Sequence, residues 1–245
     1  MKALGEFGIK LNWKFDFLDP GTTVNSLPNT FFVDVGNQLT HGIIDTHQRT
    51  NFRSSAHALS HHPDLLLNHL LKGLNEAYAR GEKGNIEVLQ QTGIEFTFIT
   101  HKSPDWDSIA TFYLSDHLLR HGKLPEPPHL NWLIDATNQI DQGTVRMKGK
   151  FSRPFMIYYQ ISSDGWGADA WRDHILLGKR LVEEVLELGR NQSYKDNPFI
   201  KEDDALGETL PNFNEHLKEL SNDWQLYQED CNKSHAFPVE LPLKE

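Results

Sequence analysis

The feature of this sequence that most constrains its fold is the alternation of short apolar runs with longer segments of helical periodicity. Runs typical of buried strands cover residues 10–17, 30–35, 42–45, 95–100 and 151–162. Segments with apolar residues at helical spacing cover residues 54–80, 107–120, 130–140 and 168–188. Such alternation is typical of α/β proteins, so we predict a mainly parallel sheet sandwiched by helices.

The chain has 245 residues, which suits one large domain or one domain with a small appendage. We predict an α/β core over residues 1–145 and a mostly helical extension or cap over residues 146–245, packed on that core. A predicted helix in the second part carries an apolar stripe from Phe213 to Tyr227. This stripe serves either the core or a partner face, so the sequence allows a homodimer.

Composition and charge exclude several classes of protein. Hydrophobic residues make up 38% of the chain and aromatic residues 11%, so the sequence predicts a buried core and not a disordered chain. The formal net charge is −10, and no long Lys/Arg run is present, which disfavours binding to long duplex nucleic acid. A small anionic substrate held by metal ions stays compatible with this charge, because the ions supply local positive charge.

Other features bear on the cellular compartment. No stretch approaches the roughly 20 apolar residues of a membrane span, and the first residues lack the apolar core of a secretory signal. The single cysteine, Cys231, excludes an internal disulfide framework and a multi-cysteine metal site. We therefore expect a cytoplasmic protein with no membrane partner.

Acidic side chains follow three of the predicted strands. Asp34 closes the run TFFVDV, Asp45 closes GIID, and the run EFTFIT leads to His101 and Asp105. Because α/β proteins place their sites at the carboxyl ends of parallel strands, we expect these side chains to gather in one pocket. Crowded carboxylates repel one another unless a cation is bound, so the pattern predicts a metal site.

The segment HKSPDWDS carries the most specific signal. His101 and Asp105 lie four residues apart across a turn, so both would face one ion. Asp107 would lie at or beside the N-cap of a helix starting at Ser108, where free N–H groups and the helix dipole stabilise a carboxylate. Taken alone, the segment fits a plain capped helix start equally well. Together with the two other acidic strand ends, it favours an oxygen-and-imidazole site for Mn²⁺ or Mg²⁺.

These motifs resemble those of the DHH phosphoesterase superfamily. THKSPDWDSIA resembles its first motif, which reads His-x-x-x-Asp-x-Asp before a helix. VDVG and DTHQR are similar to its second and third motifs, a lone Asp and then Asp-His-His. LIDATNQIDQG is similar to a fourth acidic motif. The resemblance spans residues 30–145 and is nearest to a branch of the superfamily that contains exonucleases.

The motif order departs from that of the superfamily. The His-x-x-x-Asp-x-Asp motif normally precedes the other motifs, whereas here it follows two of them, so the chain resembles a permuted version. A permutation is physically acceptable when the same strands still lie side by side. The permuted order leaves the fourth acid open among Asp64, Asp135 and Asp141.

The third motif also departs from the superfamily pattern. Thr46 stands where the first histidine of Asp-His-His is normally found. If that histidine binds a metal, the second ion has one ligand fewer here, and His47, His41 or a water would replace it. The resemblance therefore implies two ions, of which the second has the weaker ligand set.

The resemblance implies a role for each matched position. As metal ligands it implies Asp34 bridging two ions, His101 and Asp105 at the first ion, and Asp107 with Asp141 or Asp135 at the second. Asp45 would order His47. The implied catalytic residues are Asp45, His47 and Asp107. The implied contacts to substrate phosphate are His47, Arg49, Arg53 and Lys102.

The resemblance therefore implies a DHH-type metal-dependent phosphohydrolase that uses Mn²⁺ or Mg²⁺. Its substrate would be a small phosphodiester or phosphoanhydride, such as a short oligonucleotide or a nucleotide, attacked by a metal-bound hydroxide. Thr46 leaves a second interpretation open. In that interpretation the chain is a catalytically weakened relative that binds a nucleotide or phosphate ligand as a regulatory module.

Overall fold

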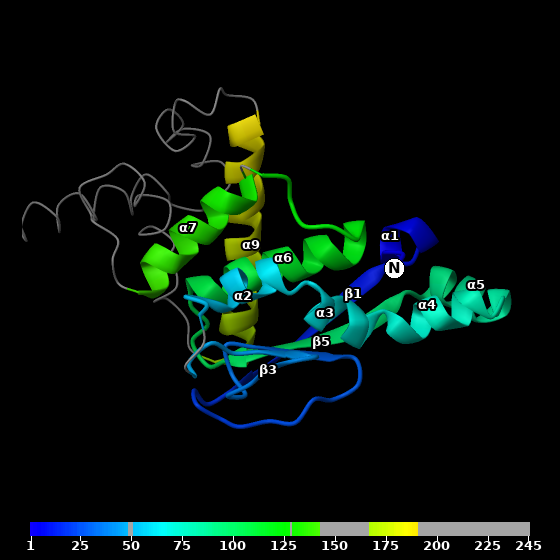
Figure 1. The fold of residues 1–245 in the computed structure, drawn as a ribbon, viewed down its shortest axis with the longest axis horizontal. Coiled ribbons are helices and arrows are strands. Elements are labelled where there is room, and N and C mark those ends of the chain that lie inside the picture. Colours follow the sequence, from blue (N-terminus) through cyan, green and yellow to red (C-terminus); the bar gives the residue numbers. More distant parts are fainter. Residues whose placement is uncertain (49–50, 128, 143–166, 191–245) are drawn as a thin grey trace, which may run out of the picture.

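The computed structural model describes residues 1–48, 51–127, 129–142 and 167–190, and its centre is a sheet (Figure 1). The sheet has five strands in the order β1-β5-β2-β4-β3. The strands are β1 (Leu11–Leu18), β2 (Thr30–Val33), β3 (Leu39–Thr40), β4 (Ile43–Ile44) and β5 (Ile94–His101). The pairs β1–β5, β5–β2 and β2–β4 are parallel, and β3 is antiparallel to β4. The prediction of an α/β protein with a mainly parallel sheet is confirmed.

Helices form the second layer of the molecule. Those described are α1 (Leu4–Phe7), α2 (Ser55–His61), α3 (Asp64–Leu70), α4 (Lys72–Ala79), α5 (Lys83–Thr92), α6 (Trp106–His121), α7 (His129–Asp141) and α9 (Ala168–Arg190). The predicted helix over 54–80 is divided into α2, α3 and α4, because Pro63 stands where α3 begins and cannot continue α2. Among the described residues, no helix is both long and apolar enough to span a membrane.

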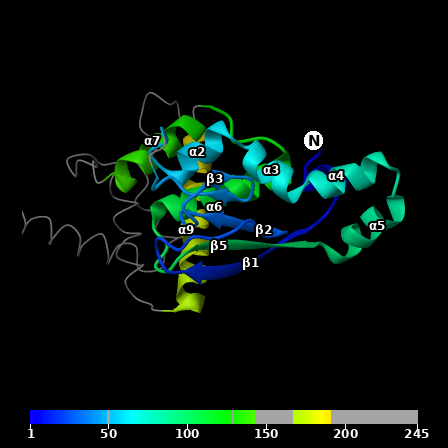
Figure 2. The same cartoon turned by 60° about the horizontal axis from the view of Figure 1, so that its bottom comes forward.

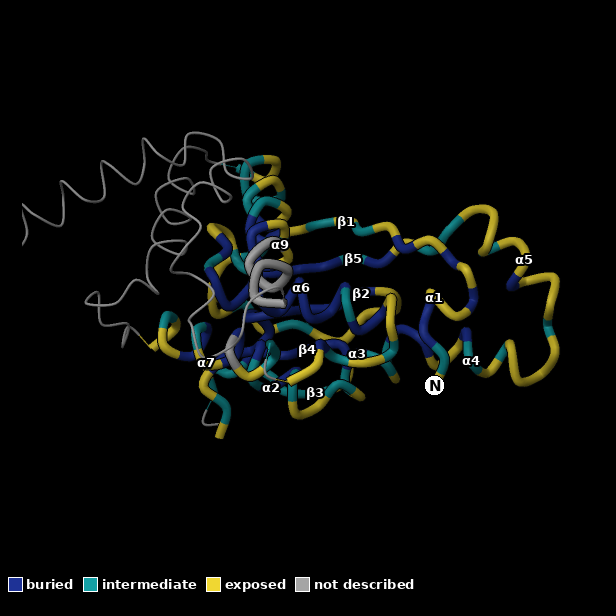
Figure 3. The backbone as a smooth tube through the Cα atoms, turned by 90° about the horizontal axis from the view of Figure 1, so that it is seen from above, coloured by how far each residue is buried: buried dark blue, intermediate teal, exposed yellow. Residues whose placement is uncertain are grey.

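One face of the sheet carries the larger core. Phe112 of α6 packs against Trp13, Phe15 and Phe98, with ring centroids 5.4, 5.1 and 4.9 Å away. Apolar residues of α2, α3, α7 and α9 belong to the same buried cluster. Figure 1 shows these helices together on one side of the strands, and Figure 3 shows α6 as buried over most of its length. All residues of β2 are buried as well. Packing on this side of the sheet therefore supplies the larger part of the described apolar core.

The opposite face has a smaller apolar cluster, and here the structure differs from our expectation. The cluster consists of Phe32, Val35, Ile43 and Ile99, with Leu18 and Val24 packed against it. No residue of a described helix belongs to it. On the same face, the polar residues Asn12, Lys14 and Asp16 of β1 are exposed to solvent. In the described part of the chain, helices thus cover one face of the sheet and not both.

A helical hairpin made of α4 and α5 extends away from the sheet (Figure 2). The sequence did not predict α5, because Ile86 is its only buried residue and its apolar periodicity is correspondingly weak. The predicted helix over 168–188 is confirmed as α9. The predicted strand over 151–162 and the stripe from Phe213 to Tyr227 lie outside the described residues, as does most of the proposed helical extension.

Gly42, in the turn between β3 and β4, gives a testable constraint on this fold. Its φ is +84°, and a Cβ added there would lie 2.6 Å from Nε2 of His69. That imidazole nitrogen lies 2.9 Å from the carbonyl oxygens of Leu27 and Thr30, so the ring cannot move without loss of these contacts. We expect Gly42→Ala to lower the free energy of unfolding by about 2 kcal/mol, measured by urea denaturation.

Gly84 provides the matched control. It lies in α5, has no close neighbour for an added Cβ and does not have a positive φ. Gly84→Ala should leave stability unchanged or raise it by about 0.5–1 kcal/mol, because alanine favours a helix. Equal effects of the two substitutions would contradict the steric role of Gly42.

Candidate metal centre

Three neighbouring strands bring acidic and histidine side chains to one edge of the sheet. His101 is the last residue of β5, Asp34 directly follows β2, and Asp45 directly follows β4. Since β5, β2 and β4 are adjacent and parallel, their carboxyl ends meet at the same edge. The expectation that these distant segments share one pocket agrees with this arrangement.

Asp34 is the side chain that the two histidines share. Its Oδ2 lies 3.2 Å from Nε2 of His101, and its Oδ1 lies 3.3 Å from Nδ1 of His47. The side chain is only 4% exposed. Its backbone has a φ of +59°, in the left-handed region that a non-glycine residue rarely adopts. The Asp34 N–H donates to the carbonyl of Ile44 at 2.9 Å, so pairing with the neighbouring strand holds this conformation.

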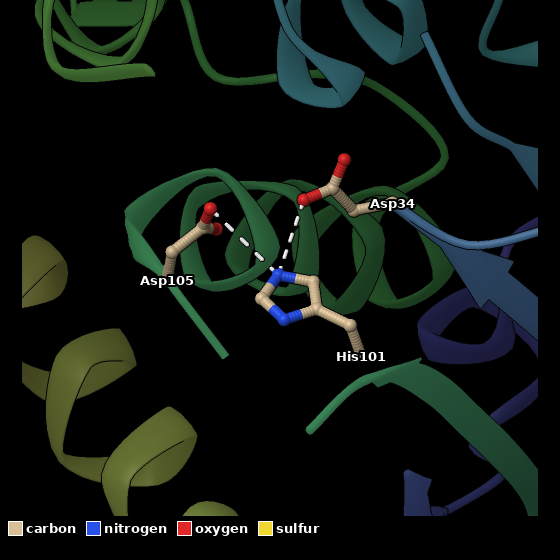
Figure 4. Close-up of side chains that lie close together, drawn as sticks. All are labelled: Asp34, His101 and Asp105. Carbon is tan, nitrogen blue, oxygen red and sulfur yellow. Dashed lines mark ion pairs between the residues drawn. The ribbon is translucent and has the colours of Figure 1, made fainter. Parts of the chain in front are cut away.

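The first candidate ligand group consists of Asp34, His101 and Asp105. One ligand atom from each lies within 4.8 Å of the other two. Nε2 of His101 lies between the two carboxylates, 3.7 Å from Oδ2 of Asp105 (Figure 4). Nδ1 of His101 lies 2.9 Å from the carbonyl of Lys102 and donates to it, because a carbonyl only accepts. That bond orients the ring so that Nε2 faces the acids, which is the usual outer support of a metal-binding histidine.

The second candidate group consists of Asp34, Asp45 and His47. Oδ1 of Asp45 accepts from the backbone N–H of His47 at 3.0 Å and lies 3.0 Å from its Nδ1. Oδ2 of Asp45 accepts from the backbone N–H of Asn37 at 2.8 Å. Asp45 therefore orients His47, as the resemblance implied. Asp34 belongs to both groups, so the two potential ion sites share one carboxylate.

The electrostatics of the cluster follow from buried, crowded acids beside two imidazoles. Burial disfavours a charged imidazole, but hydrogen bonds to Asp105 and Asp34 outweigh it and raise the pKa of His101 to about 11. Burial also raises the pKa of Asp34, against the effect of His101. Burial raises the pKa of Asp141 to about 6, and the charges of Asp105 and Asp34 add to this rise. Carboxylate oxygens and imidazole nitrogens are the donor set that suits Mn²⁺ or Mg²⁺, so these residues fit such an ion.

Asp105 and Asp107 have different local roles from those expected. Helix α6 begins at Trp106, and its N-cap is Asp105, whose Oδ1 accepts from the Ser108 N–H at 3.1 Å. The expected helix start at Ser108, with Asp107 at or beside the N-cap, is thus wrong, because the helix begins two residues earlier. The backbone of Asp105 is extended (φ −97°, ψ −170°), and its carboxylate reaches the free N–H of Ser108. His101 outweighs burial and lowers the pKa of Asp105.

Asp107 is a buried acid that belongs to neither ligand group. Its Oδ2 accepts from the Ser55 N–H at 2.7 Å, and its Oδ1 accepts from the Ala56 N–H at 2.9 Å. Burial, followed by the charges of Asp34 and Asp105, raises the pKa of Asp107 well above its ordinary value. Asp107 thus lies close to the cluster but belongs to neither group, and it anchors the start of α2.

The three candidates for a fourth acid lie in different places. Asp141 ends α7, and its charge acts on His47 as well as on Asp34. Asp135 is exposed on α7 and acts on His57 instead. Asp64 is the exposed first residue of α3. Of these three acids, the structure brings Asp141 to the two ligand groups.

The predicted phosphate contacts are less well supported. Arg49 lies outside the described residues. Arg53 is exposed next to α2, and its charge acts on His57. The ammonium of Lys102 lies 2.8 Å from Oδ1 of Asp19, so a surface carboxylate already holds it. In the described part of the chain, the side chains of Arg53 and Lys102 make no hydrogen bond or ion pair with the ligand groups.

One histidine near the site has no counterpart in the sequence motifs. His174 lies on α9, and the charge of Asp105 acts on it. Burial lowers the pKa of His174 to about 4, and Asp105 only partly opposes that effect. The only sequence signal for His174 is its position among apolar residues at helical spacing. That pattern does not predict which acidic residue lies near the helix.

Comparisons with protein-family models, with curated proteins and with solved structures found no match to this chain. The functional argument therefore depends on the residues themselves.

Proposed function

We propose that this chain is a metal-dependent phosphoesterase of the DHH type that hydrolyses a small phosphodiester or phosphoanhydride. The observation that carries the proposal is the shared carboxylate of Asp34, whose two oxygens each face a different histidine in a different ligand group. A carboxylate shared by two ion sites would hold two ions close together, which two-metal phosphoryl hydrolysis requires.

The order of the strands supports the permuted resemblance. The motif His-x-x-x-Asp-x-Asp follows β5, the lone aspartate follows β2, and Asp-Thr-His follows β4. These three strands lie next to one another in the sheet, although their order along the chain differs from that of the superfamily. A reordered chain can therefore present the same side chains at the same sheet edge.

Each residue of the two groups has a definable task. Asp34, His101 and Asp105 would hold one ion, and Asp34 with Asp45 and His47 would hold the other, with Asp141 as an additional acid. Bound Mn²⁺ or Mg²⁺ would supply Lewis acidity toward water and toward the phosphate. Asp45 keeps His47 oriented, and His47 is the exposed member of the site, with 67% of its side chain accessible to a substrate. The carbonyl of Lys102 keeps His101 oriented.

Hydrolysis of model phosphodiesters tests this function. The chain, stripped of metal, is assayed with bis(p-nitrophenyl) phosphate and with a phosphorylated dinucleotide, before and after addition of Mn²⁺. We expect turnover only with Mn²⁺. His101→Gln should reduce it at least about 100-fold, since loss of a metal ligand costs no less than loss of its outer support.

Glu95→Gln is the matched control, because Glu95 is an exposed acid on the same strand as His101 and pairs with Lys14 on the surface. Its turnover should equal that of the unsubstituted chain. Absence of Mn²⁺-dependent turnover on both substrates would refute the phosphoesterase proposal.

A second function is favoured by two specific observations. Both oxygens of Asp107 are bonded to backbone N–H groups of α2, and Thr46 replaces a histidine. A site weakened in this way would bind a nucleotide or phosphate ligand without turning it over. Calorimetry with Mn²⁺ distinguishes the two: two tight ions favour the enzyme, whereas one ion without turnover favours the binding module.

A further inference from the structure

Ser108 is a buried polar residue of α6 that contacts two of the three residues in the first ligand group. It is completely buried, and its Oγ lies 3.3 Å from Nε2 of His101. Its backbone N–H donates to Oδ1 of Asp105 at 3.1 Å. A further hydrogen bond joins its Oγ to Oγ1 of Thr100, which lies 2.7 Å away and is also completely buried. The hydroxyl of Ser108 therefore reaches the ligand group from the first turn of α6.

Three oxygen atoms lie close to Nε2 of His101. Oδ2 of Asp34 is 3.2 Å away, Oγ of Ser108 3.3 Å and Oδ2 of Asp105 3.7 Å. Figure 4 shows the two carboxylates on the same side of the imidazole ring. A hydrogen-bond partner of a ring nitrogen lies close to the direction of its N–H or lone pair. A metal ion binds the nitrogen in that same direction, so the hydroxyl oxygen lies on the side of the ring where the first ion would bind.

Binding of an ion changes the hydrogen bonds that are open to Ser108. Nδ1 of His101 donates to the carbonyl of Lys102, so an ion would take the lone pair of Nε2. Nε2 would then no longer hydrogen-bond to Ser108. A buried hydroxyl without a partner is costly, and its oxygen is attracted to a cation. Because the O–H of Ser108 is free to donate to Oγ1 of Thr100, a lone pair of its oxygen is left for the ion.

We propose that Ser108 contributes its hydroxyl oxygen to the coordination shell of the first ion, as a fourth protein ligand beside Asp34, His101 and Asp105. This inference rests on the proposed metal centre. A neutral oxygen suits the site, because the two carboxylates already balance the charge of a divalent ion. A hydroxyl oxygen is a hard donor of the kind that Mn²⁺ and Mg²⁺ prefer, and serine hydroxyls bind Mg²⁺ in phosphate-binding loops.

Loss of the hydroxyl should weaken the binding of the first ion only. We expect Ser108→Ala to lower the affinity of one Mn²⁺ ion at least about 10-fold, measured by calorimetry on the full chain. The ion of the second group should bind as before. Alanine favours a helix and keeps the backbone N–H that Asp105 caps, so the metal-free thermal midpoint should change little. In a chain with His101→Gln, which lacks the first ion, Ser108→Ala should cause no further loss.

A sulfur atom at position 108 tests direct coordination. Ser108→Cys replaces a hard oxygen with a soft sulfur, which prefers Cd²⁺ to Mn²⁺. We expect this variant to bind Mn²⁺ as weakly as Ser108→Ala does. On addition of Cd²⁺ it should gain a cadmium–thiolate absorption band, which a second substitution, Asp34→Asn, should remove. Cys231 is present in every variant, so the band is measured against the unsubstituted chain with Cd²⁺.

Ser115→Ala and Ser115→Cys are the matched controls. Ser115 is equally buried and lies on the same helix, about two turns beyond Ser108. Its Oγ donates to the carbonyl of Thr111 at 2.7 Å, within the helix. Ser115→Ala should bind both Mn²⁺ ions with unchanged affinity, and Ser115→Cys should show no additional cadmium–thiolate band.

The outcomes separate this inference from the proposed function. If Ser108→Ala binds both Mn²⁺ ions as tightly as the unsubstituted chain, or if Ser108→Cys gains no cadmium–thiolate band, the hydroxyl is not a ligand and the inference is overturned. Neither result would affect Mn²⁺-dependent hydrolysis by the unsubstituted chain. A chain that binds Mn²⁺ through Ser108 but hydrolyses no phosphodiester would refute the proposed function and leave this inference intact. A chain that binds no Mn²⁺ would refute both.

Discussion

Replacing Asp34 with asparagine should remove both metal sites in one step, because its carboxylate belongs to both ligand groups. The unsubstituted chain should bind two Mn²⁺ ions in calorimetry, and Asp34→Asn should bind none tightly. Loss of the ions removes several kcal/mol of transition-state stabilisation, so hydrolysis should fall at least about 1,000-fold. Asparagine tolerates the left-handed backbone that Asp34 adopts at φ +59°, so the substitution should not disturb the fold.

Variants of the two histidines provide the comparison. His101→Gln should lose the ion of the first group, and His47→Ala should lose that of the second, since each histidine belongs to one group only. Circular dichroism of all three variants should match that of the unsubstituted chain. Two Mn²⁺ ions bound with unchanged affinity by Asp34→Asn would exclude the shared carboxylate.

Much of the fold could be predicted from local patterns. Buried parallel strands appear as short apolar runs, which is why the segments ending at Asp34, Asp45 and His101 were identified and their gathering at one sheet edge was expected. The sequence did not predict that one face of the sheet lacks helices. Alternate residues of β1 are polar, but this pattern indicates an uncovered face only once Ile99 is known to lie on the same face as Lys14 and Asp16.

The site was predictable where residues are close in sequence and less so where helices bring them together. Asp45 and His47 form a local unit whose geometry follows from their spacing. Which of Asp105 and Asp107 caps α6 depends on the backbone conformation at the start of the helix. Two acids so close in the sequence do not determine that conformation. Asp107 accepts hydrogen bonds from α2 only because tertiary packing brings the two together, so no local sequence pattern predicts this contact.

The largest effect on stability should come from Asp116, which links three elements. Oδ1 of Asp116 accepts from the indole of Trp13 on β1 at 2.9 Å, and Oδ2 pairs with Arg120 of α6 at 3.0 Å and with Lys179 of α9 at 3.4 Å. The Asp116 side chain is only 5% exposed. Asp116→Ala leaves the indole N–H of Trp13 and the largely buried ammonium of Lys179 without this partner, so it should lower the free energy of unfolding by about 3 kcal/mol. Urea denaturation at neutral pH measures this change.

The same carboxylate predicts an acid dependence of stability. Burial disfavours its ionisation, but Arg120, Lys179 and Trp13 outweigh burial and lower the pKa of Asp116 below its ordinary value. A carboxylate with a lowered folded-state pKa stabilises the protein above the unfolded-state pKa of about 4, and this contribution is lost as the pH falls through the folded-state value. Asp116→Asn keeps an acceptor for Trp13 but has no charge, so its stability should fall less steeply below about pH 4 than that of the unsubstituted chain.

A surface carboxylate separates this effect from general acid sensitivity. Glu126 pairs with Lys123 at an exposed site, and Glu126→Gln should leave both the stability and its pH dependence unchanged. If Asp116→Asn and the unsubstituted chain lose stability in parallel as the pH falls, the charge of Asp116 contributes nothing. Lys179 is the residue of α9 that pairs with Asp116, so that outcome would also mean that this ion pair does not stabilise the position of α9.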